Sequence, residues 1–113
     1  MEMADNLKNQ VRNILSRHEG RGMAITAREL AAVTNEPERR VRLIIRELIG
    51  EGLPVASTTE APAGYFIAST WREAEEYALS IRSRLIEDAL RRRDFRRAAA
   101  HHLTPARQGR LAI

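Results

Sequence analysis

The sequence contains no cysteine, and only 4% of its 113 residues are aromatic. Without thiols the chain has neither disulfides nor thiolate metal sites. Because aromatic side chains are scarce, the hydrophobic core must be built from Leu, Ile, Val and Ala. No apolar run approaches the roughly 20 residues needed to span a bilayer, and the start MEMADNLKNQ contains no apolar signal core. The sequence therefore predicts a cytoplasmic protein without a membrane segment.

Lysine is nearly absent: Lys8 is the only lysine among 19 basic residues, and the other 18 are arginines. The formal net charge of +4 favours an anionic partner. Arginine suits that role, since its planar guanidinium forms paired hydrogen bonds with phosphate or with a guanine edge. A GC-rich genome or a heat-loving host is an alternative cause of the arginine bias.

Features that carry catalysis are also missing from the sequence. No serine stands in a nucleophile-elbow context, and no Gly-rich phosphate loop follows a predicted strand. His101 and His102 are adjacent, so they do not share one helical face, and no third ligand lies nearby in the sequence. We therefore expect no enzymatic activity, no metal or other cofactor, and no small-molecule ligand.

The centre of the chain is a pair of short helices predicted within residues 25–52. Thr26 and Glu29 have the spacing of a capping box, which starts the first helix, and Val33 lies on its predicted apolar side. Only about three residues separate this helix from the next one, predicted over residues 37–50. Such a short connection forces a sharp angle between the helices, as in a helix-turn-helix.

The second helix of this pair has an apolar face and a basic face when its residues are placed at about 100° intervals. The apolar arc comprises Val41, Ile44, Ile45, Leu48 and Ile49. The opposite side carries Arg39, Arg42, Leu43 and Arg46, with Arg40 and Glu47 at an edge. A helix of this kind packs on a core and contacts a polyanion at the same time.

Other elements surround the helical pair. An amphipathic helix is predicted over residues 4–18, before the pair. A β-hairpin follows the pair, with strands at residues 53–57 and 64–68 joined by a polar loop. Because two strands alone are marginally stable, the short apolar segment at residues 23–25 is the expected third strand.

Three stretches together resemble small winged-helix proteins of bacterial and phage genomes, which are described as DNA-binding or replication-associated. They are ITARELAAVTNEPERRVRLIIRELIGEG, VASTTEAPAGYFIAST and WREAEEYALSIRSRL, within residues 14–90. The resemblance implies a winged helix-turn-helix fold, mainly α with a small β wing. It also implies a recognition helix carrying Arg39, Arg42 and Arg46, and a wing tip at residues 57–63.

The expected function is binding of double-stranded DNA, with the second helix of the pair in the major groove. Its first arginines are expected to reach bases. The start of the first helix offers groups that can hold a phosphate, the alternative being that Thr26 is an ordinary helix cap. The loop at residues 58–63 contains Glu60 and no basic residue, so we expect the wing mainly to brace the fold. The predicted DNA-contacting residues are Arg39, Arg40, Arg42, Arg46, Thr26, Arg28, Thr58 and Thr59.

A long helix is predicted over residues 70–97, starting at the capping-box spacing of Thr70 and Glu73. One of its apolar stripes comprises Ala74, Ala78, Ile81 and Leu85, and the other Leu79, Ile86 and Leu90. A helix that is apolar on two sides packs on two neighbours. We expect one stripe to form a homodimer, the alternative being that it packs on the N-terminal helix. The arginines at residues 91–97 either contact DNA or pair with carboxylates.

The sequence thus predicts a winged-helix domain at residues 1–69, a packing or dimerisation helix at residues 70–97, and a flexible basic tail at residues 98–113. The expected role is that of a small transcriptional regulator, or of an accessory in phage replication or packaging. The alternatives are a winged-helix module that binds protein without DNA readout, and a purely structural oligomer.

Overall fold

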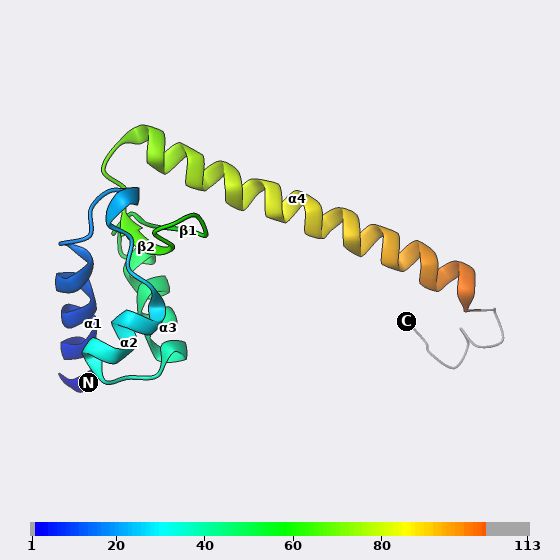
Figure 1. Ribbon diagram of the computed structural model, residues 1–113. Helices are drawn as coiled ribbons and strands as arrows, with labels where there is room; N and C mark the ends of the chain where they lie inside the picture. Colours follow the sequence, from blue (N-terminus) through cyan, green and yellow to red (C-terminus); the bar gives the residue numbers. More distant parts are fainter. Residues whose placement is uncertain (1, 104–113) are drawn as a thin grey trace. The chain divides into compact units, whose positions relative to one another are not determined.

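The computed structural model describes residues 2–103 (Figure 1). Its elements are α1 (Glu2–Leu15), the 3-10 helix η1 (Arg21–Met23), α2 (Ala27–Thr34), α3 (Glu38–Gly50), β1 (Val55–Thr58), β2 (Gly64–Ile67) and α4 (Trp71–His102). The fold is mainly helical, with a small antiparallel sheet and a long C-terminal helix, as the sequence predicts. Two compact units divide the chain between Ala78 and Leu79. Within the described range, every helix is too short or too polar to cross a membrane.

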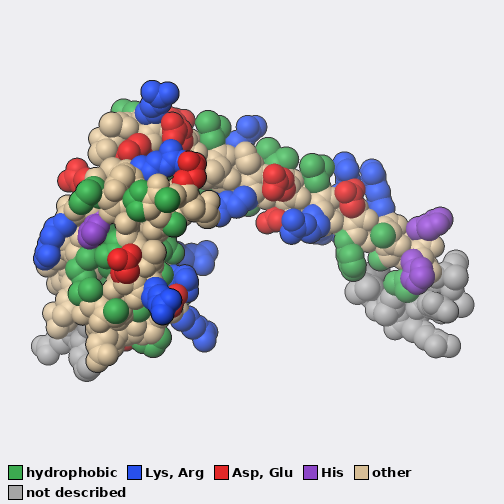
Figure 2. Space-filling view, viewed as in Figure 1, with side chains coloured by type: hydrophobic (Ala, Val, Ile, Leu, Met, Phe, Trp, Pro, Cys, Tyr) green, Lys and Arg blue, Asp and Glu red, His purple; other side chains and the backbone are tan. Residues whose placement is uncertain are grey.

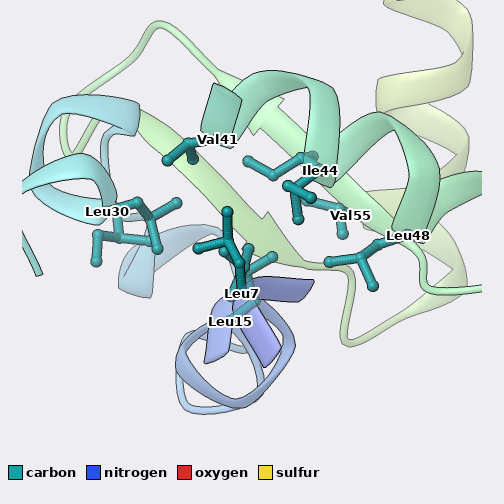
Figure 3. Packing of buried hydrophobic residues seen from close by; sticks show 10 residues of the cluster. Leu7, Leu15, Leu30, Val41, Ile44, Leu48 and Val55 are labelled. Carbon is teal, nitrogen blue, oxygen red and sulfur yellow. The ribbon is translucent and has the colours of Figure 1, made fainter. Parts of the chain in front are cut away.

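The hydrophobic core of the first unit lies between α1, α2, α3 and the hairpin (Figure 3). The α1 stripe Leu7, Val11 and Leu15 meets side chains of α2 and α3 there, and the exposed fraction of Leu30 and of Val41 is 0%. Full burial of such a side chain contributes roughly 1.5–3 kcal/mol. The expectation of an aliphatic core is confirmed. Phe66 is the one aromatic residue among the buried residues within positions 6–103.

The start of α2 is fixed by the predicted capping box. The Thr26 hydroxyl accepts a hydrogen bond from the Glu29 backbone N–H at 3.0 Å, and the Glu29 carboxylate accepts one from the Thr26 N–H at 3.0 Å. The backbone N–H and the hydroxyl of Thr26 both donate to the Glu29 carboxylate, and these two hydrogen bonds lower the pKa of Glu29. At the other end Asn35 adopts a left-handed conformation, with φ of 57°, which stops the helix. Residues 35–37 then form the short turn that the sequence predicts.

The sheet has two strands, so the expected third strand at residues 23–25 is wrong. β1 pairs antiparallel with β2 in the register Val55 to Ile67. Of the predicted third strand only Ile25 pairs, through hydrogen bonds of 2.8 and 2.7 Å with the backbone of Tyr65. Residues 23 and 24 do not pair because Met23 belongs to η1 and the Ala24 N–H bonds back to the Arg21 carbonyl, while Thr26, after Ile25, is engaged in capping α2.

Three further expectations need correction. Val33 and Ile49 are 68% and 44% exposed rather than buried, because each lies at the margin of its helix's buried arc. α1 ends at Leu15 instead of extending to residue 18. α4 runs on to His102, beyond the predicted end at residue 97, since three alanines prolong it. The remainder of the predicted tail, residues 104–113, lies outside the described residues.

The start of α4 is tied to η1 by one carboxylate. The Thr70 hydroxyl accepts from the Glu73 N–H at 3.1 Å, as the capping-box spacing predicts. The Glu73 carboxylate does not return to Thr70. It accepts from the backbone N–H groups of Ser69 at 2.9 Å and of Arg21 at 3.0 Å, and these bonds lower its pKa. The sequence therefore predicts the start of α4 correctly. The Glu73 carboxylate, however, bonds to Ser69 and to the distant Arg21 instead of closing a capping box with Thr70.

Candidate nucleic-acid interface

The outward face of α3 has three residues at its centre: Arg39, Leu43 and Arg46. Their spacing of four and three residues places them on one side of the helix, opposite the buried arc. Leu43 is 53% exposed, although it is a large aliphatic residue. In Figure 2, Lys and Arg side chains stand out from the part of the first unit in which α3 lies. The helix thus presents two guanidinium groups around one exposed apolar side chain.

The four predicted contact arginines of α3 differ in their ion pairs. Arg40 lies 3.4 Å from Glu36, and Arg42 lies 3.1 Å from Glu38, each at a helical spacing of four residues. Within residues 6–103, Arg39 and Arg46 have no carboxylate oxygen within 4.0 Å. Exposed pairs are worth about 0–1 kcal/mol, so a phosphate group would readily replace either glutamate. The uncompensated charge of α3 nevertheless lies at Arg39 and Arg46.

The carboxylates near the C-terminal end of α3 are bound by basic residues of α1. Lys8 Nζ lies 2.6 Å from Glu51 and 3.2 Å from Glu47, and an Arg12 guanidinium nitrogen lies 3.3 Å from Glu51. The hydrogen bonds raise the pKa of Lys8 and lower the pKa of Glu51. This cluster holds α1 on α3 and offsets negative charge that would otherwise repel a polyanion approaching α3.

At the start of α2, the predicted contact residue Thr26 is hydrogen-bonded within the capping box, whereas the other one, Arg28, is exposed. The hydroxyl and the backbone N–H of Thr26 are both engaged by Glu29 in the capping box. Arg28 is exposed, and no carboxylate within residues 6–103 pairs with it. A phosphate contact here would therefore rest on the Arg28 guanidinium, with Thr26 fixing the helix start.

The hairpin loop also holds two predicted contact residues. The Thr58 hydroxyl accepts a hydrogen bond from the Glu60 N–H at 3.1 Å, which shapes the loop. The Glu60 carboxylate forms an ion pair with Arg21. Thr59 is exposed. The loop therefore offers a nucleic acid little beyond a neutral hydroxyl, which agrees with an expected bracing role.

Leu43 is the functional candidate that the sequence reasoning missed. Helical periodicity places it among the arginines, but periodicity alone assigns no role to an apolar residue on that side. The signal was present in the pattern, because a leucine at the centre of a basic face has no core to enter. Its exposure makes it available for apolar contact with a partner.

Within residues 6–103, no cluster of three or more His, Asp or Glu side chains could hold a metal ion. Comparisons with protein-family models, with curated proteins and with solved structures found no match for this chain. The resemblance to winged-helix proteins therefore stays a prediction. The function has to be inferred from the geometry of α3 and its neighbours.

Proposed function

We propose that the first unit is a winged helix that binds double-stranded DNA with α3 as its recognition helix. The observation that carries this proposal is the face formed by Arg39, Leu43 and Arg46, where two unpaired guanidinium groups flank an exposed leucine. The order of α2, a three-residue turn, α3 and a hairpin supports it.

The proposed contacts follow from positions along α3. Arg39 lies in the first turn, from which recognition helices reach base edges, and it would pair with guanine O6 and N7. Leu43 would lie against a thymine methyl group, since apolar side chains read that group in the major groove. Arg46, about two turns after Arg39, would bind a phosphate, and Arg28 at the start of α2 would bind another.

Arg40 and Arg42 have a secondary part in this scheme. Each would exchange its glutamate for a phosphate when α3 approaches the duplex. Because the hairpin loop brings no free positive charge, it would brace the fold and add at most a contact from Thr59. Affinity therefore rests mainly on α3.

The proposed biological role is that of a small cytoplasmic regulator of transcription, or of an accessory in phage replication or packaging. The second candidate is a winged-helix module that binds another protein without reading DNA. Exposure of Val33 and Leu43, 68% and 53%, favours this alternative, because exposed aliphatic side chains also suit a protein partner.

Fluorescence anisotropy with labelled random-sequence duplex DNA, titrated at two salt concentrations, separates the two functions. DNA binding predicts tight association at low salt that weakens steeply as salt rises, because each neutralised phosphate releases counterions. No association below tens of micromolar at low salt would contradict the DNA proposal and leave the protein-binding alternative.

A further inference from the structure

The second unit has no core of its own within its described residues, 79–103. α4 contains no buried residue along its whole length, and this part of it is a continuous helix. Its exposed large apolar side chains include Leu79 (56%), Leu85 (65%) and Ile86 (46%). An isolated helix in water is marginally stable, and most helices in proteins are stabilised by packing of an apolar face. This unit therefore needs a partner surface.

Between Ala78 and Leu90 the two apolar stripes of α4 adjoin each other and form one arc over half of the circumference, not two separate sides as expected. At about 100° per residue, the arc from Ile81 round to Leu90 spans about 180°. Between Ala78 and Leu90 it contains Ala78, Leu79, Ile81, Leu85, Ile86, Ala89 and Leu90, interrupted only by Arg82. The other half is polar and carries Ser80, Ser83, Arg84, Glu87 and Asp88. So wide an apolar face is typical of a helix that packs against other helices.

Along α4, negatively charged residues are concentrated before this apolar stretch and positively charged residues after it. Carboxylates cluster before it, at Glu73, Glu75 and Glu76, whereas arginines dominate after it, from Arg91 to Arg97. Within the described residues Arg91 and Arg93 pair with neighbouring aspartates, while Arg92, Arg96 and Arg97 have no carboxylate within 4.0 Å. The start of the helix keeps a net negative charge, although Glu76 pairs with Arg72 and with Arg21, and the other end carries unpaired positive charge.

This distribution decides between the two orientations of a helix pair. A parallel pair of α4 helices would place arginine cluster beside arginine cluster, which is repulsive. An antiparallel pair places the acidic start of each helix beside the arginine cluster of the other. The helix dipoles also oppose each other in that arrangement.

We propose that the apolar half of α4 is covered by the same helix of a second copy of this chain, running antiparallel and crossing near Leu85 and Ile86. In this register Glu75 lies level with Arg96 of the second copy, and both positions fall on the same half of the helix as the apolar arc. The arginine cluster then serves assembly. The pairing is independent of the proposed DNA binding, so either can fail without the other.

Light scattering of the full chain tests the pairing. A species of twice the 12.8 kDa chain mass is expected at micromolar concentration. Leu85→Glu, which places a charge in the apolar half, should raise the dimer dissociation constant at least tenfold. Ser80→Glu adds the same charge on the polar half and should leave the dimer intact. Circular dichroism of both variants checks that the helices of the first unit persist.

Orientation is tested by disulfide trapping, for which the absence of native cysteine is an advantage. An equimolar mixture of the single variants Glu75→Cys and Arg96→Cys, one of them carrying a size tag, should form a mixed cross-linked dimer on oxidation. Each variant alone should remain largely uncrosslinked. A chain that stays at 12.8 kDa would overturn the proposal and leave the face to a different protein. The antiparallel register would be overturned if each cysteine variant formed a cross-linked dimer with itself, or if the mixture formed no mixed cross-linked dimer.

Discussion

Gly64 at the start of β2 packs directly on the backbone of Ile25, just before α2. A Cβ atom added to Gly64 would overlap the Ile25 carbonyl group and lie 2.7 Å from the backbone nitrogen of Thr26. Gly64 also has a φ of +133°, which residues with side chains rarely adopt. The hairpin can therefore approach the start of the helical pair only because this position is glycine.

Gly64→Ala is expected to destabilise the first unit by roughly 2 kcal/mol or more, because backbone strain and overlap act together. Gly22→Ala is the matched control, since nothing lies within 4 Å of a Cβ added there and its φ is ordinary. Urea denaturation of the two variants gives the comparison. Equal stability of Gly64→Ala and the wild type would contradict the close approach of the two backbones.

The Glu73 carboxylate should make a pH-dependent contribution to stability. At pH 7 we expect Glu73→Gln to unfold more easily by about 1 kcal/mol, since charge-assisted bonds to the Ser69 and Arg21 N–H groups are weakened. The hydrogen bonds lower the pKa of Glu73 in the folded chain below its ordinary value of about 4.5. Its stabilisation is therefore fully present above that ordinary value and is lost as pH falls through the lower folded pKa.

Thermal unfolding of the wild type and Glu73→Gln between pH 7 and pH 3 measures this dependence. The stability gap should be constant near neutral pH and should close as the pH falls below about 4.5. Glu87→Gln removes an exposed carboxylate from the polar half of the same helix and controls for net charge. A gap that widens in acid would refute the proposed role of the Glu73 hydrogen bonds.

Local features of the fold could be predicted because their physical causes lie within a few residues. The capping box of Thr26 and Glu29 depends on two side chains that bond to backbone groups three residues away. The link from Glu73 to Arg21 could not be predicted, since it joins residues 52 positions apart. The bridge between Ile25 and Tyr65 could not be predicted either, because it depends on how closely the hairpin packs against the segment before α2.

The candidate site was predictable in outline only. Helical periodicity placed Arg39 and Arg46 on one face, and the structure keeps them there. Periodicity does not tell which arginines are paired with glutamates, because an ion pair depends on side-chain conformation as well as spacing. Arg40 and Arg42 were therefore given the same weight as the unpaired residues.

Leu43 should influence sequence preference more than overall affinity. Replacement by Ala removes apolar contact worth about 1 kcal/mol, so preference for thymine at one position should fall roughly fivefold. Affinity for random DNA should change less than about threefold, because phosphate contacts dominate it. Selection of sites from a random duplex pool measures both. Val33→Ala alters another exposed aliphatic residue and should leave the selected site unchanged.

An unchanged thymine preference in Leu43→Ala would remove this side chain from the proposed interface. A loss of preference in Val33→Ala as well would point to a general effect on the helical pair instead of a base contact.

The proposed DNA binding is tested most directly by two double variants of α3 that remove the same charge. Arg39→Ala/Arg46→Ala deletes the unpaired arginines, whereas Arg40→Ala/Arg42→Ala deletes the arginines paired with glutamates. Anisotropy titrations with random duplex DNA, performed over a series of salt concentrations, give the affinity and the slope of log K against log salt. We predict that the first variant loses more than tenfold in affinity, with a slope shallower by about one to two units. We predict that the second loses less than about threefold. No loss in the first variant would contradict the assignment of α3 as the DNA-binding helix. Equal losses in the two variants would contradict the larger role given to the unpaired arginines.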